Sequence, residues 1–349
     1  MTSPSPAGAD LVALAQYLDG VLEGGLRGPL NADLIAGGRS NLTYFLTDGH
    51  TRWVLRRPPL GHVLDRAHDM GREARVMSAL AATPVPVPRI VTTCADPDVL
   101  GAPFFVMEHV DGRVLRTDSD FKTLSPADAQ HVAEDFIDVL AALHQLRPAD
   151  VGLTDFGRPE GFAARQVRLW ARQRESSWVR DVPGMTELGA ALAEKVPSPA
   201  TASVIHGDYR LDNMVLNLAD QRVAAVLDWE LATVGDPLMD LGLAYVYWIG
   251  WAGLDGNVVG GTPGMIPGFF NGQEFVDRYR TVTGFGVEQF DWYVAFAFFK
   301  VAVLLEGIHC RYTQGLTVGE GFAEIGQMVP KLVERGRDAL SGSLFANRA

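Results

Sequence analysis

The sequence has few cysteines and fewer basic than acidic residues. Cys94 and Cys310 are its only cysteines and lie far apart, without a CxxC pair or a Cys/His cluster. We therefore expect neither a disulfide framework nor a structural zinc site, and we expect His309 beside Cys310 to be an ordinary core or surface residue. With 30 Lys and Arg against 42 Asp and Glu, the net charge is −12. This charge argues against a nucleic-acid partner, which needs a basic face, and would suit a cationic substrate.

Export and membrane signals are lacking as well. The opening residues, MTSPSPAGAD, contain no basic segment followed by an apolar run, so no signal peptide is expected. The most hydrophobic stretch, Leu241–Leu254, is shorter than the roughly 20 residues that span a bilayer, and it predicts a buried core helix. No G-x-G-x-x-G opens a helix after an early strand, which argues against an NAD-dependent dehydrogenase. We expect a cytoplasmic protein with no membrane partner.

The order of the predicted elements indicates an α+β fold in two lobes. Residues 32–57 read as three strands with turns between them, and the segment 66–82 repeats apolar residues at helical spacing. Helical patterns dominate after residue 125, with a β-rich island at residues 204–228. The expected division is a small β-rich lobe over residues 1–108 and a larger, mainly helical lobe over residues 109–349.

Three polar side chains interrupt the apolar run VIHGDYRLDNMVLN, which covers residues 204–217. They are His206, Asp208 and Asn213, followed at the end of the next apolar run by Asp228. The spacing H-x-D-x-x-x-x-N with a later strand-end Asp is the set that kinases use for phosphoryl transfer. The plainer interpretation is that these residues only form turns.

An antiparallel hairpin is expected between the two apolar runs. If Leu218 pairs with Val223 across the polar turn ADQR, Asn213 faces Asp228 on the neighbouring strand. An amide oxygen and a carboxylate are hard oxygen ligands of the kind that Mg²⁺ prefers, and Asp208 on the preceding loop is placed to receive a proton from an attacking hydroxyl. The hairpin therefore favours the functional interpretation.

Two sequence blocks resemble the aminoglycoside phosphotransferase (choline kinase-like) family of small-molecule kinases. They are HGDYRLDN and VLDWELATVGDPLMDL, in that order and at a similar separation, and the resemblance extends from about Ala32 to beyond Ile325. GGRSNLTYFL and WVLRRPP are most similar to the subgroup of kinase-like domains fused to acyl-CoA dehydrogenases. The resemblance implies a bilobal protein-kinase-like fold with ATP bound in the cleft.

The same resemblance implies roles for residues in these blocks. Asp208 is then the catalytic base, with His206 bracing its loop, and Asn213 and Asp228 bind Mg²⁺. Arg210, two residues past Asp208, is a candidate for the transferred phosphate, although a solvated side chain is an equal alternative.

Departures from the kinase pattern lie further along the second block. The triplet 228–230, DWE, stands where protein kinases have D-F-G, so no Phe switch is expected. For Asp236 and Asp240 a structural role is favoured, in which they cap a helix and hold the loop.

The first lobe departs from the kinase pattern at its phosphate ligand. Val54 and Arg56 lie on one face of the strand WVLR, and Arg56 takes the place of the usual Lys. Glu73 on the following helix is expected to hold Arg56. Arg57 is the alternative phosphate ligand, because strand register is easily misjudged by one residue.

Nucleotide contacts are also expected from the first glycine loop and from the connection between the lobes. The loop GGRS is not a standard glycine motif, but its place between two strands favours a phosphate-covering loop, with contacts from Gly38, Arg39 and Ser40. The connecting segment would bind adenine through its backbone, and the residues concerned are Met107, Glu108 and Val110.

The acceptor is not encoded by a decisive motif. Aromatic residues in the second lobe, namely Trp248, Trp251, Phe269, Phe270, Trp292 and Phe299, are expected to be mostly core. The hydroxylated small molecule is either a cationic aminoglycoside-like alcohol or, as the dehydrogenase-linked resemblance implies, a hydroxyacyl thioester or related metabolite. A catalytically silent nucleotide-binding module is the alternative of another class.

Overall fold

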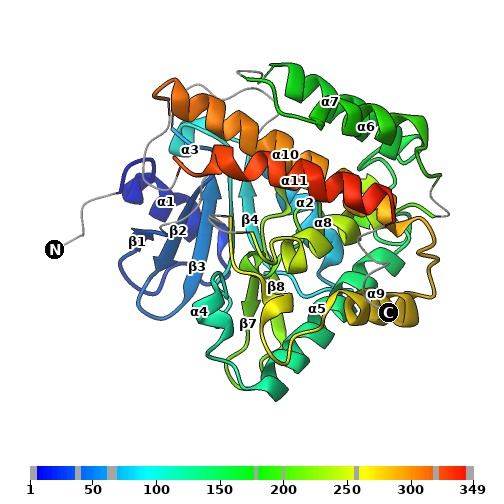
Figure 1. The fold of residues 1–349 in the computed structure, drawn as a ribbon. Helices are drawn as coiled ribbons and strands as arrows, with labels where there is room; N and C mark the ends of the chain where they lie inside the picture. Colours follow the sequence, from blue (N-terminus) through cyan, green and yellow to red (C-terminus); the bar gives the residue numbers. More distant parts are fainter. Residues whose placement is uncertain are drawn as a thin grey trace. The chain divides into compact units, whose positions relative to one another are not determined.

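The computed structural model describes residues 6–35, 41–60, 69–176, 180–198, 201–254, 259–316 and 322–342 (Figure 1). Contacts divide the chain into two compact units. The first combines residues 1–112 with residues 224–232, and the second combines residues 113–223 with residues 233–349. The short return segment in the first unit, which carries Asp228, was not part of the expected division at residue 108.

The first unit is built on a five-stranded antiparallel sheet in the order β1-β2-β3-β5-β4. Its elements are α1 (Leu11–Val21), β1 (Asn31–Leu34), β2 (Leu42–Thr47), β3 (Arg52–Arg57), α2 (Met70–Leu80), β4 (Ile90–Cys94), α3 (Pro97–Leu100), β5 (Phe104–Glu108) and the short helix η2 (Trp229–Leu231). The three expected strands and the following helix are present, whereas β4, which follows the proline-rich residues 83–89, was not predicted.

The two faces of β3 have different environments because side chains alternate along a strand. Trp53 and Leu55 join the apolar cluster that α1 covers on one face. Val54 and Arg56 lie on the opposite face, as the sequence predicted, and Val54 is buried beside Met107 of the neighbouring strand. The sheet therefore directs Arg56 away from the cluster under α1.

The second unit is mainly helical. Its elements are α4 (Asp118–Phe121), α5 (Pro126–Gln145), α6 (Phe162–Ser176), α7 (Met185–Glu194), β6 (Ser203–Ile205), the short helix η1 (Leu211–Asn213), β7 (Met214–Leu216), β9 (Thr233–Gly235), α8 (Pro237–Ile249), the short helix η3 (Pro263–Met265), α9 (Gly272–Thr283), α10 (Phe290–Thr313) and α11 (Ile325–Leu340). Strand β8 (Val223–Val226) begins at the last residue of the segment 113–223, and its other residues belong to the first unit. Figure 1 shows α10 and α11 running side by side, and they pack on each other.

Two apolar helices form the centre of this unit. The expected core helix is confirmed as α8, in which nearly every residue is buried. Helix α10 is long and apolar enough to cross a membrane by length and composition alone, and the sequence interpretation overlooked it. Because 72% of its apolar window is buried inside the protein, α10 has the burial of a core helix.

The register predicted for the hairpin is wrong. The bond that closes its turn runs from the Asn217 N–H to the Arg222 carbonyl at 2.8 Å, so the turn begins one residue earlier than expected. Leu218, the expected strand residue, is 64% exposed in that turn. Asn213 ends the short helix η1 and Asp228 precedes the short helix η2, so neither is a ladder residue. Loop backbone, rather than strand pairing, positions both.

Candidate active site

Arg56 is the centre of an acidic cluster in the first unit. Its guanidinium Nε lies 3.0 Å from the Glu73 carboxylate, which is the contact expected from the sequence. Its Nη2 donates a hydrogen bond to Asp228 and lies 3.8 Å from the carboxylate of Glu230. Three carboxylates thus share one guanidinium, and the sequence interpretation did not anticipate Glu230.

Burial sets the electrostatics of this cluster. The Glu73 side chain is only 2% exposed, and burial raises its pKa to about 7. The Arg56 guanidinium opposes that rise, whereas the charges of Asp228 and Glu230 add to it. For Arg56 itself, burial lowers the pKa but the carboxylates raise it more, so the net direction is upward. The cluster carries an excess of negative charge that favours a bound cation.

Asp228 occupies an unusual backbone conformation. Its φ of 66° is in the left-handed region, which only one other non-glycine residue among the described ones adopts. Non-glycine residues keep this conformation only where their surroundings hold it, and they are found disproportionately at functional sites. The next residue, Trp229, is fully buried, and its indole N–H donates to the Val226 carbonyl at 2.9 Å. This anchor fixes the backbone beside Asp228.

Arg57 has a different environment from its neighbour. It is buried, and its guanidinium donates to the backbone carbonyls of Gly8 and Leu100, the second at 2.8 Å. These carbonyls occupy its donors, so Arg56 and not Arg57 is the candidate phosphate ligand of β3.

In the second unit, Asp240 holds the loop that carries Asp208. Its carboxylate accepts the backbone N–H groups of His206 at 2.5 Å and Gly207 at 2.7 Å. Burial raises the pKa of Asp240, but the bonds from His144 and the nearby His206 outweigh it and lower the pKa. Asp240 is therefore held as an anion, and its expected structural role is confirmed.

The backbone and side chain of Asp208 are fixed by neighbours on its own loop. Its N–H lies 3.2 Å from Nδ1 of the buried His206, so His206 braces the loop from within. Asn213 donates its amide Nδ2 to the Asp208 carbonyl at 2.9 Å and to the Asp208 carboxylate at 3.1 Å. With Nδ2 engaged, the amide oxygen of Asn213 is the atom left to meet a ligand. Gly207 supplies the left-handed turn, with a φ of 87°.

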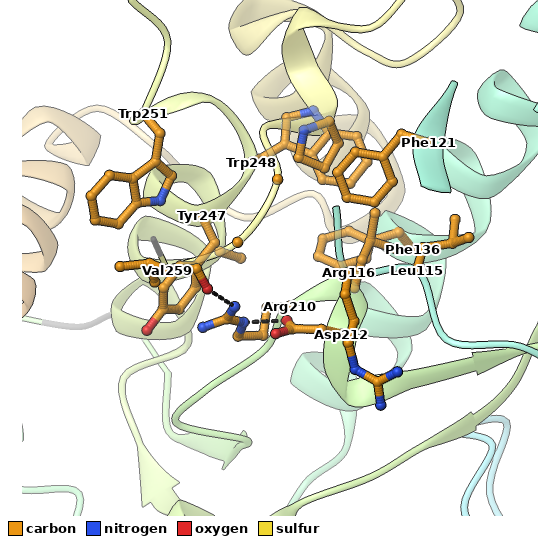
Figure 2. A pocket seen from close by; sticks show the side chains of 15 residues that line it. Leu115, Arg116, Phe121, Phe136, Arg210, Asp212, Tyr247, Trp248, Trp251 and Val259 are labelled. Atoms are coloured by element: carbon orange, nitrogen blue, oxygen red, sulfur yellow. Dashed lines mark hydrogen bonds and ion pairs between the residues drawn. The ribbon is translucent and has the colours of Figure 1, made fainter. Parts of the chain in front are cut away.

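Arg210 lies in the wall of a pocket beside this loop (Figure 2). Its guanidinium pairs with Asp212, donates to the Val259 carbonyl at 2.9 Å and stacks over the Tyr247 ring at 4.4 Å. Aromatic side chains, among them Trp248 and Trp251, form part of the remaining wall. The structure thus places Arg210 against pocket residues.

Of the other aromatic candidates, Trp292, Phe299 and Phe269 are buried, as expected for core residues. Asp236 caps α8 through a bond from the Leu238 N–H, so its expected capping role is confirmed. Both cysteines are free, and Cys94 is buried.

The residues expected to contact adenine lie at the end of β5 and just beyond it. Met107 is buried in the strand, and the Glu108 N–H is already bonded to the Arg89 carbonyl at 2.9 Å. The Glu108 carboxylate forms an exposed ion pair with the Arg89 side chain. Val110 lies beyond the end of the strand and is half-buried. The loop residues Gly38, Arg39 and Ser40 lie outside the described residues.

The chain is similar to known phosphotransferases and to part of a larger protein. The sequence pattern described as "Phosphotransferase enzyme family" matches residues 32–281. The chain is 36% identical over 321 residues to acyl-CoA dehydrogenase family member 11 of Gallus gallus, covering 88% of this chain and 40% of that protein. The chain therefore spans about two fifths of the length of this curated relative.

Solved structures have the same fold. A crystal structure from Ralstonia eutropha JMP134, described as a candidate aminoglycoside phosphotransferase, is 32% identical with a TM-score of 0.82, and the match covers 95% of this chain and 98% of that chain. A ternary complex of aminoglycoside phosphotransferase APH(4)-Ia with AMP-PNP and hygromycin B is 14% identical with a TM-score of 0.60, covering 93% and 98%. The expected α+β, kinase-like fold and the expected resemblance are both confirmed.

Proposed function

The chain belongs to the phosphotransferase enzyme family, and we propose that it transfers the γ-phosphate of ATP to a hydroxyl group of a small molecule, with Mg²⁺ as cofactor. A small-molecule phosphotransferase follows from the family, whereas the nucleotide, the metal and the acceptor are the proposal. The presence of AMP-PNP in a structural relative of the same fold supports ATP as the donor.

The observation that carries the proposal is the fixed carboxylate of Asp208. Asn213 holds this carboxylate at 3.1 Å, and the loop before it is fastened to Asp240. In the proposed step the acceptor oxygen forms a bond to the γ-phosphorus, the bond from that phosphorus to the ADP oxygen breaks, and the acceptor proton passes to Asp208. An alcohol needs such a base because its own pKa is far above neutral, and general bases typically contribute about 10²–10⁴-fold.

The magnesium ion is proposed from the chemistry of two oxygen donors. The proposed ligands are the amide oxygen of Asn213, whose nitrogen is engaged by Asp208, and the carboxylate of Asp228. Both are hard oxygen donors, and the surplus of carboxylates around Arg56 favours a divalent cation electrostatically. When bound, the ion would neutralise charge on the phosphate oxygens.

Arg56 is the proposed phosphate ligand of the first unit. Its guanidinium is a planar fork with several donors, which lets one nitrogen stay on Glu73 while another turns from Asp228 to a phosphate oxygen. Contacts by Gly38, Arg39 and Ser40, and adenine contacts by the backbone of residues 107–110, remain part of the proposal.

The acceptor class we favour is a small hydroxylated metabolite such as a hydroxyacyl thioester. The similarity to acyl-CoA dehydrogenase family member 11 supports it over an aminoglycoside-like alcohol. Fold similarity alone does not choose between these acceptors, because one fold hosts many substrates.

One observation favours a second candidate, a catalytically silent nucleotide-binding module. Asp228, the proposed metal ligand, is engaged by the Arg56 guanidinium, and a module without turnover would keep this pair. The two candidates differ in whether phosphate is transferred after ATP binds.

A single-turnover assay with Mg-ATP and a metabolite library, read by mass spectrometry, tests the proposal. We expect Asp208→Asn to slow the chemical step by about 10²–10⁴-fold while ATP affinity stays within about twofold. Asp220→Asn, in the exposed hairpin turn, is the matched control and should behave as wild type. A chemical step in Asp208→Asn as fast as wild type would remove Asp208 as the base, and ATP binding without any transfer would favour the silent module.

A further inference from the structure

Lys300 is an exception within an apolar helix. Helix α10 is buried along most of its length, and Lys300 is its one charged residue between Asp291 and Glu306. A charge in such surroundings costs free energy unless it is paired or hydrogen-bonded, so a lysine at this position calls for a specific reason.

The Lys300 ammonium lies at the catalytic loop. Its Nζ donates to the carbonyl of Gly207, the residue before Asp208, at 3.2 Å. It also lies 5.6 Å from the centre of the Trp170 ring on α6, a helix that packs against α10. Lys300 is therefore one peptide group away from the residue that we assign as the base.

Donors remain on both side chains. An ammonium group has three N–H donors, and among the described residues only the Gly207 carbonyl accepts one. Burial lowers the pKa of Lys300 overall, although the charges of Asp208 and Asp240 act on it and favour its ammonium form, and in the described part of the chain neither carboxylate is hydrogen-bonded to it. The buried indole Nε1 of Trp170 also has no acceptor in that part of the chain. Buried donors without an acceptor are costly, so an oxygen-rich partner is expected at this position.

We propose that Lys300 and Trp170 form the acceptor subsite of this phosphotransferase and bind an anionic oxygen group of the substrate, such as a carboxylate or a phosphate, close to its reacting hydroxyl. Among hydroxylated metabolites, such a subsite favours a free hydroxy acid over its neutral thioester. This inference rests on the proposed function. Asp208 and Asp240 would repel an anionic acceptor, so the Lys300 ammonium is the group beside the loop that can attract an anionic oxygen and disfavour an ammonium at the same point.

The test uses three probes that differ in one group. They are β-hydroxybutyrate, the amino alcohol in which CH₂NH₃⁺ replaces its carboxylate, and the diol in which CH₂OH replaces it. Binding is measured by ligand-observed NMR, which does not require turnover, and phosphate transfer from Mg-ATP is measured in parallel. Wild type should bind the hydroxy acid best and the amino alcohol worst.

Lys300→Met should weaken binding of the hydroxy acid about 10- to 100-fold, as expected for loss of a charge-assisted hydrogen bond, and should leave the diol within about twofold. Trp170→Phe keeps an aromatic ring but removes the indole N–H, and it should weaken binding of the hydroxy acid severalfold. This variant provides the test if Lys300→Met does not fold. Lys331→Met, on the exposed face of α11, is the matched control.

Two kinds of outcome separate the subsite from the proposed function. Equal binding of the three probes, binding of none, or an unchanged preference in Lys300→Met would overturn the subsite. Loss of affinity for all three probes alike would mean that Lys300 only supports the loop. A preference for the hydroxy acid without phosphate transfer would instead contradict the proposed function and leave the subsite standing.

Discussion

Replacing Glu73 by Gln should change how the stability of the protein depends on pH. Glu73 is buried against Arg56, and burial together with the charges of Asp228 and Glu230 raises its pKa to about 7 from the ordinary 4.5. The folded protein therefore holds the proton of Glu73 more tightly than the unfolded chain does. Its contribution to stability is complete below about pH 4.5 and is lost as the pH rises through about 7.

The size of the effect follows from that difference. Each pKa unit is worth about 1.4 kcal/mol, so the rise of the Glu73 pKa from 4.5 to about 7 corresponds to at most about 3 kcal/mol. Glutamine has the shape of the protonated carboxyl and does not titrate. Relative to wild type, Glu73→Gln should gain up to about 3 kcal/mol in unfolding free energy between about pH 5 and pH 8.

Urea unfolding of both proteins at several pH values measures this difference. Glu108→Gln is the control, because the carboxylate of Glu108 is 44% exposed in its ion pair with Arg89 and such pairs are worth only about 0–1 kcal/mol. If the difference in unfolding free energy between wild type and Glu73→Gln is the same at about pH 5 and at about pH 8, Glu73 is not a buried carboxyl with a raised pKa.

Three further predictions concern the same two units. Arg57→Ala should lower the unfolding free energy by about 3 kcal/mol, because buried backbone carbonyls lose their donors. Arg56→Ala should mainly weaken the use of ATP in steady-state kinetics. The opposite pattern would exchange the roles of the two arginines. Asp228→Ala should abolish turnover with an unchanged circular dichroism spectrum, and a fully active variant would exclude it as a metal ligand. Asp240→Asn should lower the melting temperature and kcat together, because one of the N–H groups of His206 and Gly207 loses its acceptor; an unchanged melting temperature would contradict the brace.

Local sequence patterns were enough to predict most of the residues that the first unit supplies to the candidate site. Alternation along β3 put Arg56 and Val54 on one face, and helical spacing put Glu73 in the first turn of α2. Both predictions need only the repeat with which side chains return to the same face of a strand or a helix. The choice between Arg56 and Arg57 was left open because it depends on which face the rest of the chain covers, and α1 covers the face of Arg57.

Loop geometry was the part that the sequence did not determine. The contact between Asp208 and Asn213, which the short helix η1 brings together, was not predicted. The predicted hairpin register was wrong because a four-residue turn fits residues 218–221 as well as residues 219–222, and the exposed Leu218 resembles a strand residue. The left-handed backbone of Asp228 leaves no pattern in an apolar run.

Lys300 can be recognised as unusual in the sequence, although it was not predicted to be a site residue. A single charge within a long apolar helix is a rare and costly choice, so such a residue can be selected from the sequence alone. Its partner cannot be selected in the same way, because the contact to Gly207 joins residues 93 positions apart. Sequence reasoning can therefore point to the lysine, and only the fold shows that it reaches the catalytic loop.

The departure at Arg56 and the extra acid at Glu230 are best explained together. A lysine ammonium is a compact point charge, whereas the guanidinium fork presents donors in two directions. The fork lets Arg56 contact Glu73 through Nε and Asp228 through Nη2 at once, with Glu230 at 3.8 Å. A lysine carries the same single charge in one compact ammonium group, so it does not present donors to carboxylates on two sides as the fork does. Arg56 and Glu230 therefore belong to one electrostatic arrangement, in which a single guanidinium lies among three carboxylates.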